Sequence, residues 1–180
     1  YCNTKVKLNY HNIARNLPKV IDQIKQICKV HNQDKGIIHT HNNNITNQLA
    51  AAVKESRFLI REPGVRNELL LEQHAESPDP TVLISPSMSH GVDLKDDLAR
   101  FQIIVKAPFL PIRDKRIEKL MKNNYDWYVN KMLCALIQSC GRGVRSKKDH
   151  CITYILDGAI VESVINNKHK LPKYFLDRFS

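Results

Sequence analysis

Four residues near position 140 combine a chemistry and a spacing that suit a phosphate group. They follow the pattern Q-x-x-G-R-x-x-R and are Gln138, Gly141, Arg142 and Arg145. Residues three or four apart share one face of a helix, so their side chains would point the same way. Arginine offers a planar, permanently charged fork that can neutralise charge developing on a transferred phosphoryl group. A solvated basic turn is the alternative, but the glutamine and glycine at this spacing favour a phosphate-facing role.

A second polar stretch directly follows the apolar run at 82–84. Its polar and glycine positions are Ser85, Ser87, Ser89, His90, Gly91 and Asp93. Hydroxyls and backbone amides after a buried strand can contact phosphates, and Asp93 could accept a ribose hydroxyl or hold an arginine or a water in place. An ordinary loop in which Asp93 caps a turn is the alternative.

A third polar cluster, Thr40-His41-Asn42, follows the apolar residues 37–38. Thr40 and His41 at a strand end could hydrogen-bond a nucleic-acid backbone, a contact that fixes position without reading sequence. An asparagine that caps the next helix is compatible with this role. The pair His39 and His41 lacks a third ligand nearby in the sequence, so we expect no metal in this chain.

Two further features have simpler explanations. Asp126 is expected to cap the helix that leads to Gln138, with Trp127 and Tyr128 as core anchors and base stacking as a weaker role. The basic runs 113–122 and 147–148 are expected to be solvated faces, although either could follow a phosphate backbone.

Composition favours a polyanionic partner. The 180 residues suit one domain, and 28 Lys and Arg against 18 Asp and Glu give a net charge of +10. Nucleic acid is the first candidate, because neutralising phosphates releases counterions, and a basic surface carried for solubility is the alternative. No apolar run approaches the roughly 20 residues of a membrane span, so we expect no membrane partner and a cytoplasmic protein, or a nucleoid or nuclear one if it binds DNA.

Cysteine usage and the first residue place further limits. Five cysteines without a C-x-x-C pair indicate neither a disulfide framework nor a zinc ribbon, so we expect them to be reduced and mostly buried. The chain begins at Tyr1 without an initiator methionine, which suggests a fragment of a longer protein.

Hydrophobic periodicity predicts alternating helices and strands. Helices are expected at 13–30, 45–53, 65–74, 113–123, 127–140 and 171–179, and strands at 37–40, 57–60, 82–84, 101–105 and 152–156. This alternation predicts an α/β domain with a mostly parallel sheet covered by helices on both faces. We expect one domain over residues 1–180, with an irregular lead-in at 1–12, a core at about 13–167 and a tail or helix at 168–180. Working residues of such sheets gather at the carboxyl ends of the strands.

The usual phosphate-binding loops are missing from the sequence. There is neither a G-x-x-x-x-G-K-[ST] loop nor a G-x-G-x-x-G turn after a strand. If the arginines serve phosphoryl transfer, the phosphate-holding loop and the metal-binding carboxylates must therefore come from another domain.

Taken together, the motifs resemble the second RecA-like domain of superfamily-two helicases of the XPD/DinG group, over residues 13–157. The segment 36–40 is similar to the motif four strand, and 82–94 resembles motif five. The segment 104–111 looks like the family's next strand with its proline-bearing loop, and 138–145 matches motif six. The fold implied is a three-layer, P-loop NTPase-type RecA-like domain.

The resemblance also implies roles for these residues. Gln138, Arg142 and Arg145 would face ATP and Mg²⁺ held mainly by a preceding RecA-like domain, with Arg145 or Arg142 as the finger. Gly91 and Asp93 would couple that cleft to single-stranded or forked DNA, on which the family moves in the 5′-to-3′ direction. Many members carry an iron–sulfur cluster in the first half, about which this chain, without clustered cysteines, says nothing. Alone, the chain should hydrolyse no ATP.

Two other classes stay open at this point. A non-catalytic nucleic-acid-binding or regulatory module that retains the same fold would explain the positive charge and the missing phosphate loop. An α/β transferase is weaker, because no glycine-rich cofactor turn is visible. A phosphate-binding loop upstream of Tyr1 would favour the motor domain.

Overall fold

The computed structural model describes residues 2, 6–60, 66–86, 94, 96–141 and 150–179. Its strands are β1 (Gly36–His39), β2 (Phe58–Ile60), β3 (Val82–Ser85), β4 (Phe101–Ile104) and β5 (Ile152–Ile155). Its α-helices are α1 (Ile13–Val30), α2 (Asn43–Ala52), α3 (Asn67–Glu76), α4 (Lys115–Asn123), α5 (Tyr125–Cys140), α6 (Gly158–Asn166) and α7 (Lys173–Leu176). Two short 3₁₀ helices, η1 (Asp96–Leu98) and η2 (Lys168–Lys170), complete the described elements.

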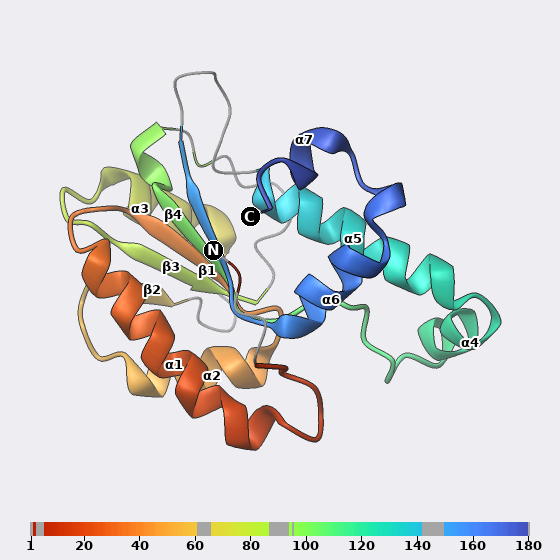
Figure 1. The fold of residues 1–180 in the computed structure, drawn as a ribbon. Helices are drawn as coiled ribbons and strands as arrows, with labels where there is room; N and C mark the ends of the chain where they lie inside the picture. Colours follow the sequence, from red (N-terminus) through yellow and green to blue (C-terminus); the bar gives the residue numbers. More distant parts are fainter. Residues whose placement is uncertain are drawn as a thin grey trace.

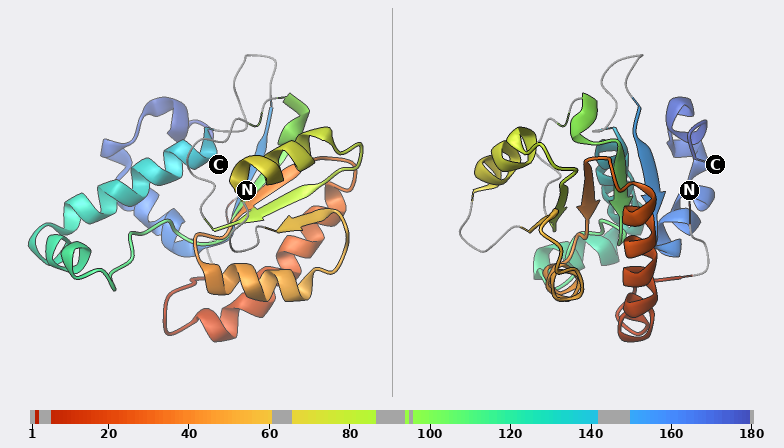
Figure 2. Two further views of the ribbon diagram at one scale, coloured as in Figure 1. Left: turned by 180° about the vertical axis from the view of Figure 1, so that it is seen from behind. Right: turned by 90° about the vertical axis from the view of Figure 1, so that its left-hand side faces the viewer.

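The five strands form one parallel sheet in the order β2-β3-β1-β4-β5. In the middle of the sheet, Ile37 of β1 pairs with Leu83 of β3 on one side and with Gln102 of β4 on the other. Parallel neighbours need crossover connections, which the intervening helices provide. Figures 1 and 2 show helices on both sides of the sheet, which confirms the three-layer α/β architecture predicted from the sequence.

One face of the sheet is covered by α1 and α2. The apolar residues of α1 recur every three or four positions, and Leu17, Val20 and Ile24 are buried against the sheet as that spacing predicts. They join a cluster with Ile38 of β1 and Ile103 of β4. Burying such side chains contributes about 1.5–3 kcal/mol each and holds these two helices on the sheet.

The opposite face is covered in two parts. Leu70 of α3 packs with Ile37 and Leu83, whereas α5 and α6 pack with Ile104 and Ile155 near the β5 edge. These two clusters leave buried polar residues on the same face of the sheet; His39, Ser85 and Gln102 are each at most 1% exposed. Buried polar groups need hydrogen-bond partners. The part of this face that carries these three residues is therefore a polar interruption in an otherwise apolar core.

Helix α6 is absent from the elements predicted by periodicity. Its start is fixed instead by Asp157, whose Oδ1 accepts hydrogen bonds from the backbone N–H of Ala159 at 3.1 Å and of Leu8 at 3.2 Å. The other carboxylate oxygen accepts from the N–H of Ala107 at 3.0 Å. Leu8 is 1% exposed and Val6 packs against the same cluster, so the polar lead-in expected at 1–12 contributes to the core.

Other boundaries also differ from the predicted ones. Helix α5 is capped by Asn124, whose Oδ1 accepts from the N–H of Trp127 at 2.9 Å, so the predicted cap at Asp126 is wrong. Val30, the last residue of α1, is 76% exposed although it is apolar. Helix α7 covers four residues, shorter than the helix expected at 171–179.

Arg57 lies just before β2, and its side chain binds backbone carbonyl groups at the end of α1. Its guanidinium donates to the carbonyl oxygens of Cys28 at 3.0 Å, His31 at 3.0 Å and Asp34 at 3.2 Å, and to that of Pro80 at 3.1 Å. A cation at a helix C-terminus satisfies carbonyls that lack partners within the helix. These hydrogen bonds join the end of α1 to the amino-terminal ends of β2 and β3.

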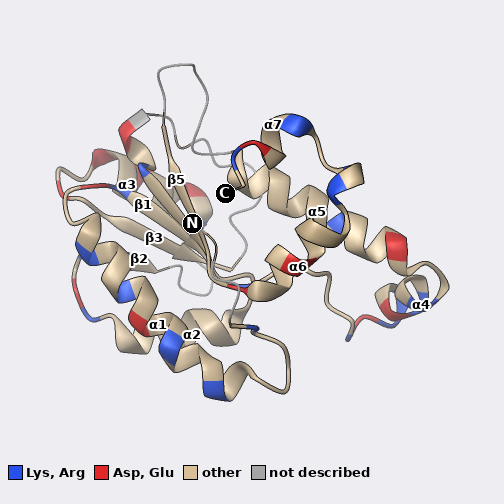
Figure 3. Ribbon diagram, in the orientation of Figure 1, with Lys and Arg blue, Asp and Glu red and all other residues tan. Residues whose placement is uncertain are grey.

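Charged residues lie mainly on the outer helices. Figure 3 shows Lys and Arg on α1, on α4 and in the segment around α7. Helix α4 buries none of its residues and lies at the far end of the molecule from the strand β2. Among the residues that the structure describes, no helix combines the length and apolar character needed to cross a membrane.

Candidate functional site

The residues singled out from the sequence fall at opposite ends of the parallel strands. We call the side of the sheet where the strands end its carboxyl edge, and the side where they begin its amino edge. Thr40 follows the carboxyl end of β1, and Ser85 is the last residue of β3. Gly141, by contrast, follows α5 on the side where β4 and β5 begin, as the contact between Gln102 and the Cys140 carbonyl shows. Thr40 and Ser85 therefore lie at the carboxyl ends of their strands, where the sequence predicts that working residues gather.

At the carboxyl edge, Thr40 and Ser85 join two strand ends. The backbone N–H of Thr40 donates to the carbonyl oxygen of Ser85 at 3.1 Å, and its hydroxyl bonds that of Thr46 on α2 at 2.6 Å. Thr40 and Ser85 are both 0% exposed. In this structure they hold β1, β3 and α2 together, and a direct contact with nucleic acid by either of them stays a prediction.

His41 presents a polar ring at the same edge. Its φ of 51° lies in the left-handed region, where the chain turns sharply from β1 into α2. Asn42 then caps α2, with Oδ1 accepting from the N–H of Ile45 at 3.1 Å, as expected from the sequence. The His41 ring stacks on that of His39 with centroids 5.9 Å apart, and its Nε2 has no hydrogen-bond partner among the described residues.

Burial lowers the pKa of His41 from 6.5 to about 4. Its imidazole is therefore neutral near pH 7, and it can hydrogen-bond or stack with a ligand but cannot pair with a phosphate as a cation. Within the part of the chain that the structure describes, no group of three or more His, Cys, Asp or Glu side chains could hold a metal ion.

At the amino edge, α5 presents the start of the arginine motif. Gln138 and Gly141 are exposed on its last turn, and the N–H of Gly141 closes the helix on the carbonyl oxygen of Ile137 at 3.0 Å. The helix ends at Cys140, with Gly141 as its C-cap. Arg142 and Arg145 lie outside the described residues.

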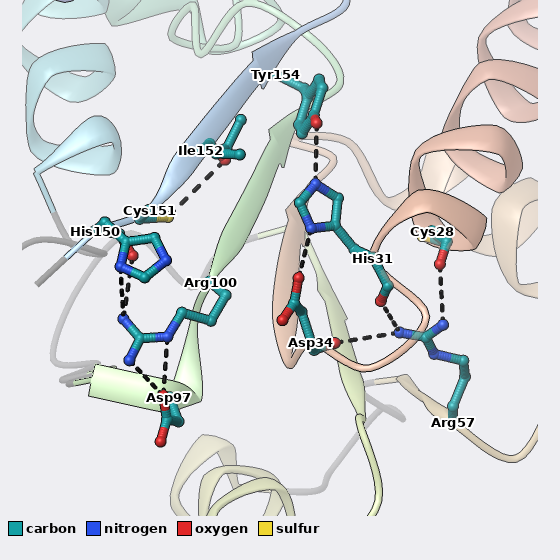
Figure 4. Close-up of polar contacts among 10 residues, drawn as sticks. All are labelled: Cys28, His31, Asp34, Arg57, Asp97, Arg100, His150, Cys151, Ile152 and Tyr154. Atoms are coloured by element: carbon teal, nitrogen blue, oxygen red, sulfur yellow. Dashed lines mark hydrogen bonds and ion pairs between the residues drawn. The ribbon is translucent and has the colours of Figure 1, made fainter.

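Arg100, which sequence reasoning did not single out, joins two segments at this edge. Its Nε donates to Asp97 Oδ1 at 2.9 Å, and its Nη1 lies 3.4 Å from the carbonyl oxygen of His150. Figure 4 shows the Arg100 guanidinium between Asp97 of η1 and His150, the residue that precedes Cys151 at the start of β5. One side chain thus connects the end of the 85–97 stretch to the end of the arginine-bearing segment 142–149.

Gln102, also missed, holds the end of α5 against β5. Its Nε2 donates to the carbonyl oxygen of Cys140 at 3.1 Å and to Thr153 Oγ1 at 2.7 Å. The amide therefore fixes the end of α5 to the face of β4 and β5. A polar residue inside the apolar run Phe101–Ile104 is the signal that could have identified it, because such a residue is retained in a core only with partners.

The connection between β3 and β4 leads from one edge to the other. It leaves the carboxyl edge at Ser85 and must reach the amino end of β4 at Phe101, because the strands are parallel. Leu94 packs with Ile37 on the sheet, and His74 Nε2 donates to the carbonyl oxygen of Leu98 at 2.8 Å. These contacts fix the returning end of the connection on the face that carries α3.

Eight positions of this connection, residues 87–93 and 95, lie outside the described part of the chain. They include five of the predicted site residues, which are Ser87, Ser89, His90, Gly91 and Asp93.

Solved XPD structures share this architecture. An apo XPD structure matches with a TM-score of 0.74 at 16% identity, covering 93% of this chain and 38% of that chain. A second XPD helicase structure matches with a TM-score of 0.72 at 19% identity, covering 93% and 33%. Xpd4 of S. tokodaii gives 0.65 at 16% identity, covering 97% and 36%. The fold is therefore the RecA-like fold of XPD/DinG-type helicases.

The chain belongs to the helicase C-terminal domain family, whose model matches residues 24–176. The ATP-dependent DNA helicase CHL1 of Debaryomyces hansenii is 30% identical over 104 residues, which are 48% of this chain and 13% of that protein. The chain thus spans a small part of this relative and 33–38% of the solved XPD structures at TM-scores above 0.7.

Proposed function

We propose that this chain is the second motor domain of an ATP-dependent DNA helicase related to XPD and CHL1. The family match over residues 24–176 carries the proposal. The separation of the candidate residues onto two edges of one sheet supports it, because a motor domain must contact a nucleotide and a nucleic-acid track at once.

The amino edge faces ATP in this proposal. Arg142 or Arg145 acts as the finger that stabilises charge on the transferred phosphoryl group, with Gln138 and Gly141 beside it. ATP and Mg²⁺ are held mainly by a preceding RecA-like domain, because this sequence lacks a phosphate-binding loop. The exposure of Gln138 and Gly141 is consistent with a surface that meets another domain.

The carboxyl edge faces single-stranded DNA. His41 contributes a neutral ring to this track, while Thr40 and Ser85 supply the strand ends that support it. The stretch 87–90, with Ser87, Ser89 and His90, extends the same track. Contacts of this kind fix the position of the strand without reading its sequence, as movement along DNA requires.

The connection from β3 to β4 couples the two edges. Gly91 and Asp93 lie on this connection, and Arg100 joins its far end to the arginine-bearing segment through Asp97 and His150. Closure of the two motor domains around ATP would therefore move the DNA-facing stretch, and repeated closure gives stepping in the 5′-to-3′ direction.

Replacing the arginines in the full-length protein tests the proposal. Loss of an arginine finger lowers kcat by about 10³–10⁵-fold, so Arg142→Ala or Arg145→Ala should abolish most DNA-stimulated ATP hydrolysis while single-stranded DNA binding persists. Lys148→Ala is the matched control, since it removes a positive charge from the same segment without touching the motif.

Three outcomes would count against this function. Unchanged hydrolysis in both arginine variants would remove the finger role. DNA binding without any ATP hydrolysis in the parent protein would favour a non-catalytic nucleic-acid-binding module with the same fold. ATP hydrolysis by the 180-residue chain alone would contradict the assignment of the phosphate loop to another domain.

A further inference from the structure

A cavity of about 470 Å³ lies at the amino edge, beside the arginine-bearing segment. Its walls come from the end of α5, the start of β5 and the region of α7, and they include Ile137, Ile155 and Phe175. Gly141 and His150, the described residues on either side of 142–149, also line it. The cavity therefore borders the described residues on both sides of the segment that carries the arginines.

Three of the chain's five cysteines line this cavity, namely Cys2, Cys140 and Cys151. The expectation that the cysteines are mostly buried is wrong, because these three are partly exposed and Cys134 is exposed, whereas Cys28 is buried. The structure holds all five as thiols. Their gathering from three separate parts of the chain is not required by the motor function.

We propose that Cys140 and Cys151 form an oxidation site in which a disulfide links the two sides of the sequence that carries the arginines. Cys140 is the last residue of α5, and Cys151 immediately precedes β5, so the two thiols flank residues 142–149 on both sides. This inference rests on the proposed function, because the consequence concerns the arginines of that segment.

The backbone brings the two cysteines to one face of the sheet. Cys151 and Thr153 are two residues apart along the β5 strand direction, so their side chains point to the same face. Gln102 Nε2 bonds Thr153 Oγ1 at 2.7 Å and the Cys140 carbonyl oxygen at 3.1 Å, which places the end of α5 over that face. Both cysteines then border the same cavity.

The environment assigns different roles to the two thiols. Burial raises the pKa of Cys140 to about 12, and the neighbouring Cys151 and Cys2 thiols add to the rise. Cys140 is therefore protonated near neutral pH and a poor first nucleophile. Cys151 lies beside His150, which the Arg100 guanidinium contacts (Figure 4), and we assign the first attack on a hydroperoxide to its thiol.

The oxidation proceeds in two balanced steps. The Cys151 thiolate attacks one oxygen of hydrogen peroxide, the O–O bond breaks, and hydroxide leaves as Cys151 becomes a sulfenic acid. The Cys140 sulfur then attacks the Cys151 sulfur, the S–O bond breaks, and the departing oxygen takes the Cys140 proton so that water leaves. Two thiols and one peroxide thus give one disulfide and two waters, and a dithiol reverses the reaction by exchange.

The disulfide would fix the two ends of the segment against each other. A disulfide needs Cα atoms within about 7 Å, so the bond would hold the end of α5 and the start of β5 at that separation. Displacing a catalytic group by about 1 Å can cost about 100-fold in rate. Oxidation should therefore switch off hydrolysis without removing either arginine.

Peroxide treatment of the full-length protein tests this site. We expect mass spectrometry of the oxidised protein to find a Cys140–Cys151 linked peptide, and DNA-stimulated ATP hydrolysis to fall by about 100-fold and to recover with dithiothreitol. Cys151→Ser should prevent both the link and the loss. Cys134→Ser is the matched control, because Cys134 is exposed on α5 away from the cavity and should leave both intact.

Other outcomes overturn the proposal. No Cys140–Cys151 link, or a link that uses Cys2 in place of either, refutes the assigned pair. Equal loss of hydrolysis in Cys151→Ser and parent protein assigns the sensitivity to a group elsewhere in the full-length protein. Failure of the proposed function is distinguishable, because it would show as absent hydrolysis in the reduced protein, whereas the linked peptide is scored without any activity.

Discussion

Replacing Asp157 with alanine should destabilise the fold more than other single polar replacements at the β5 edge. The carboxylate is 2% exposed and accepts hydrogen bonds from three backbone N–H groups, those of Leu8, Ala107 and Ala159. These donors belong to the N-terminal segment, to the loop after β4 and to the first turn of α6. One side chain therefore holds together three segments that are far apart in the sequence.

The magnitude follows from what the alanine leaves behind. A hydrogen bond to a charged acceptor contributes about 1.5–3 kcal/mol, and a buried donor left without a partner costs about 1–3 kcal/mol. Loss of the α6 cap costs about 1 kcal/mol on its own. These contributions overlap, because the local backbone can relax toward water. We expect a loss of about 3–5 kcal/mol in the free energy of unfolding, a large part of the 5–15 kcal/mol of an ordinary domain.

Urea unfolding followed by circular dichroism measures this loss. Glu162→Ala is the matched control, because Glu162 pairs with Lys7 at 2.7 Å and so joins the same N-terminal segment to α6. The side chains of Lys7 and Glu162 are 46% and 57% exposed, and exposed ion pairs contribute about 1 kcal/mol or less. A loss for Asp157→Ala no larger than that for Glu162→Ala would refute the reasoning.

Two further predictions concern His41 and Gly36. Burial holds the pKa of His41 at about 4 against 6.5 in the unfolded chain, so its contribution to stability is complete above pH 6.5 and falls, by up to about 3 kcal/mol, as the pH drops toward 4. The variant His41→Asn should lose this part of the pH dependence, because asparagine tolerates the left-handed backbone but does not titrate. The measurement is the urea midpoint as a function of pH between 7 and 4.5. The same pH dependence in both proteins would contradict the prediction. A Cβ at Gly36 would lie 2.4 Å from Phe101 Cε1, so Gly36→Ala should cost about 1–3 kcal/mol in a thermal or urea melt. Gly141→Ala, whose Cβ would lie 3.4 Å from the Ile137 carbonyl oxygen, is the control, and equal costs would rule out overpacking.

Local patterns in the sequence were sufficient to predict most of the sheet. Short apolar runs such as Val82–Ser85 are buried on both faces in a parallel sheet, so they stand out against the amphipathic helices between them. The same reasoning identified α1 and α5 closely, because each has a long stripe of apolar residues. Strand order and register depend on contacts distant in sequence and were not predicted.

Helix α6 shows where local patterns fail. Its sequence is short and rich in the β-branched residues Ile160, Val161 and Val164, which favour strands as readily as helices. The helix forms because Asp157 caps it and because those side chains pack with α5 and Ile155. Both causes are tertiary, so periodicity over nine residues could not reveal them.

The candidate site was predictable in its residue types but not in its arrangement. Motif spacing identified Gln138 and Gly141, but it did not predict where they lie relative to Thr40. In the structure, Thr40 is at the opposite edge of the parallel sheet. Arg100 and Gln102 were missed because their roles depend on partners up to 51 residues away, as in the contact of Gln102 with Thr153. Such contacts leave no short motif.

Single-turnover hydrolysis by the full-length protein tests the central claim most directly. With ATP and single-stranded DNA already bound, the rate of the chemical step reports whether Arg142 or Arg145 acts on the phosphoryl group. The account predicts that alanine at the finger position slows this step by about 10³-fold or more while ATP binding changes little. A chemical step as fast as that of the parent protein in both variants would contradict it.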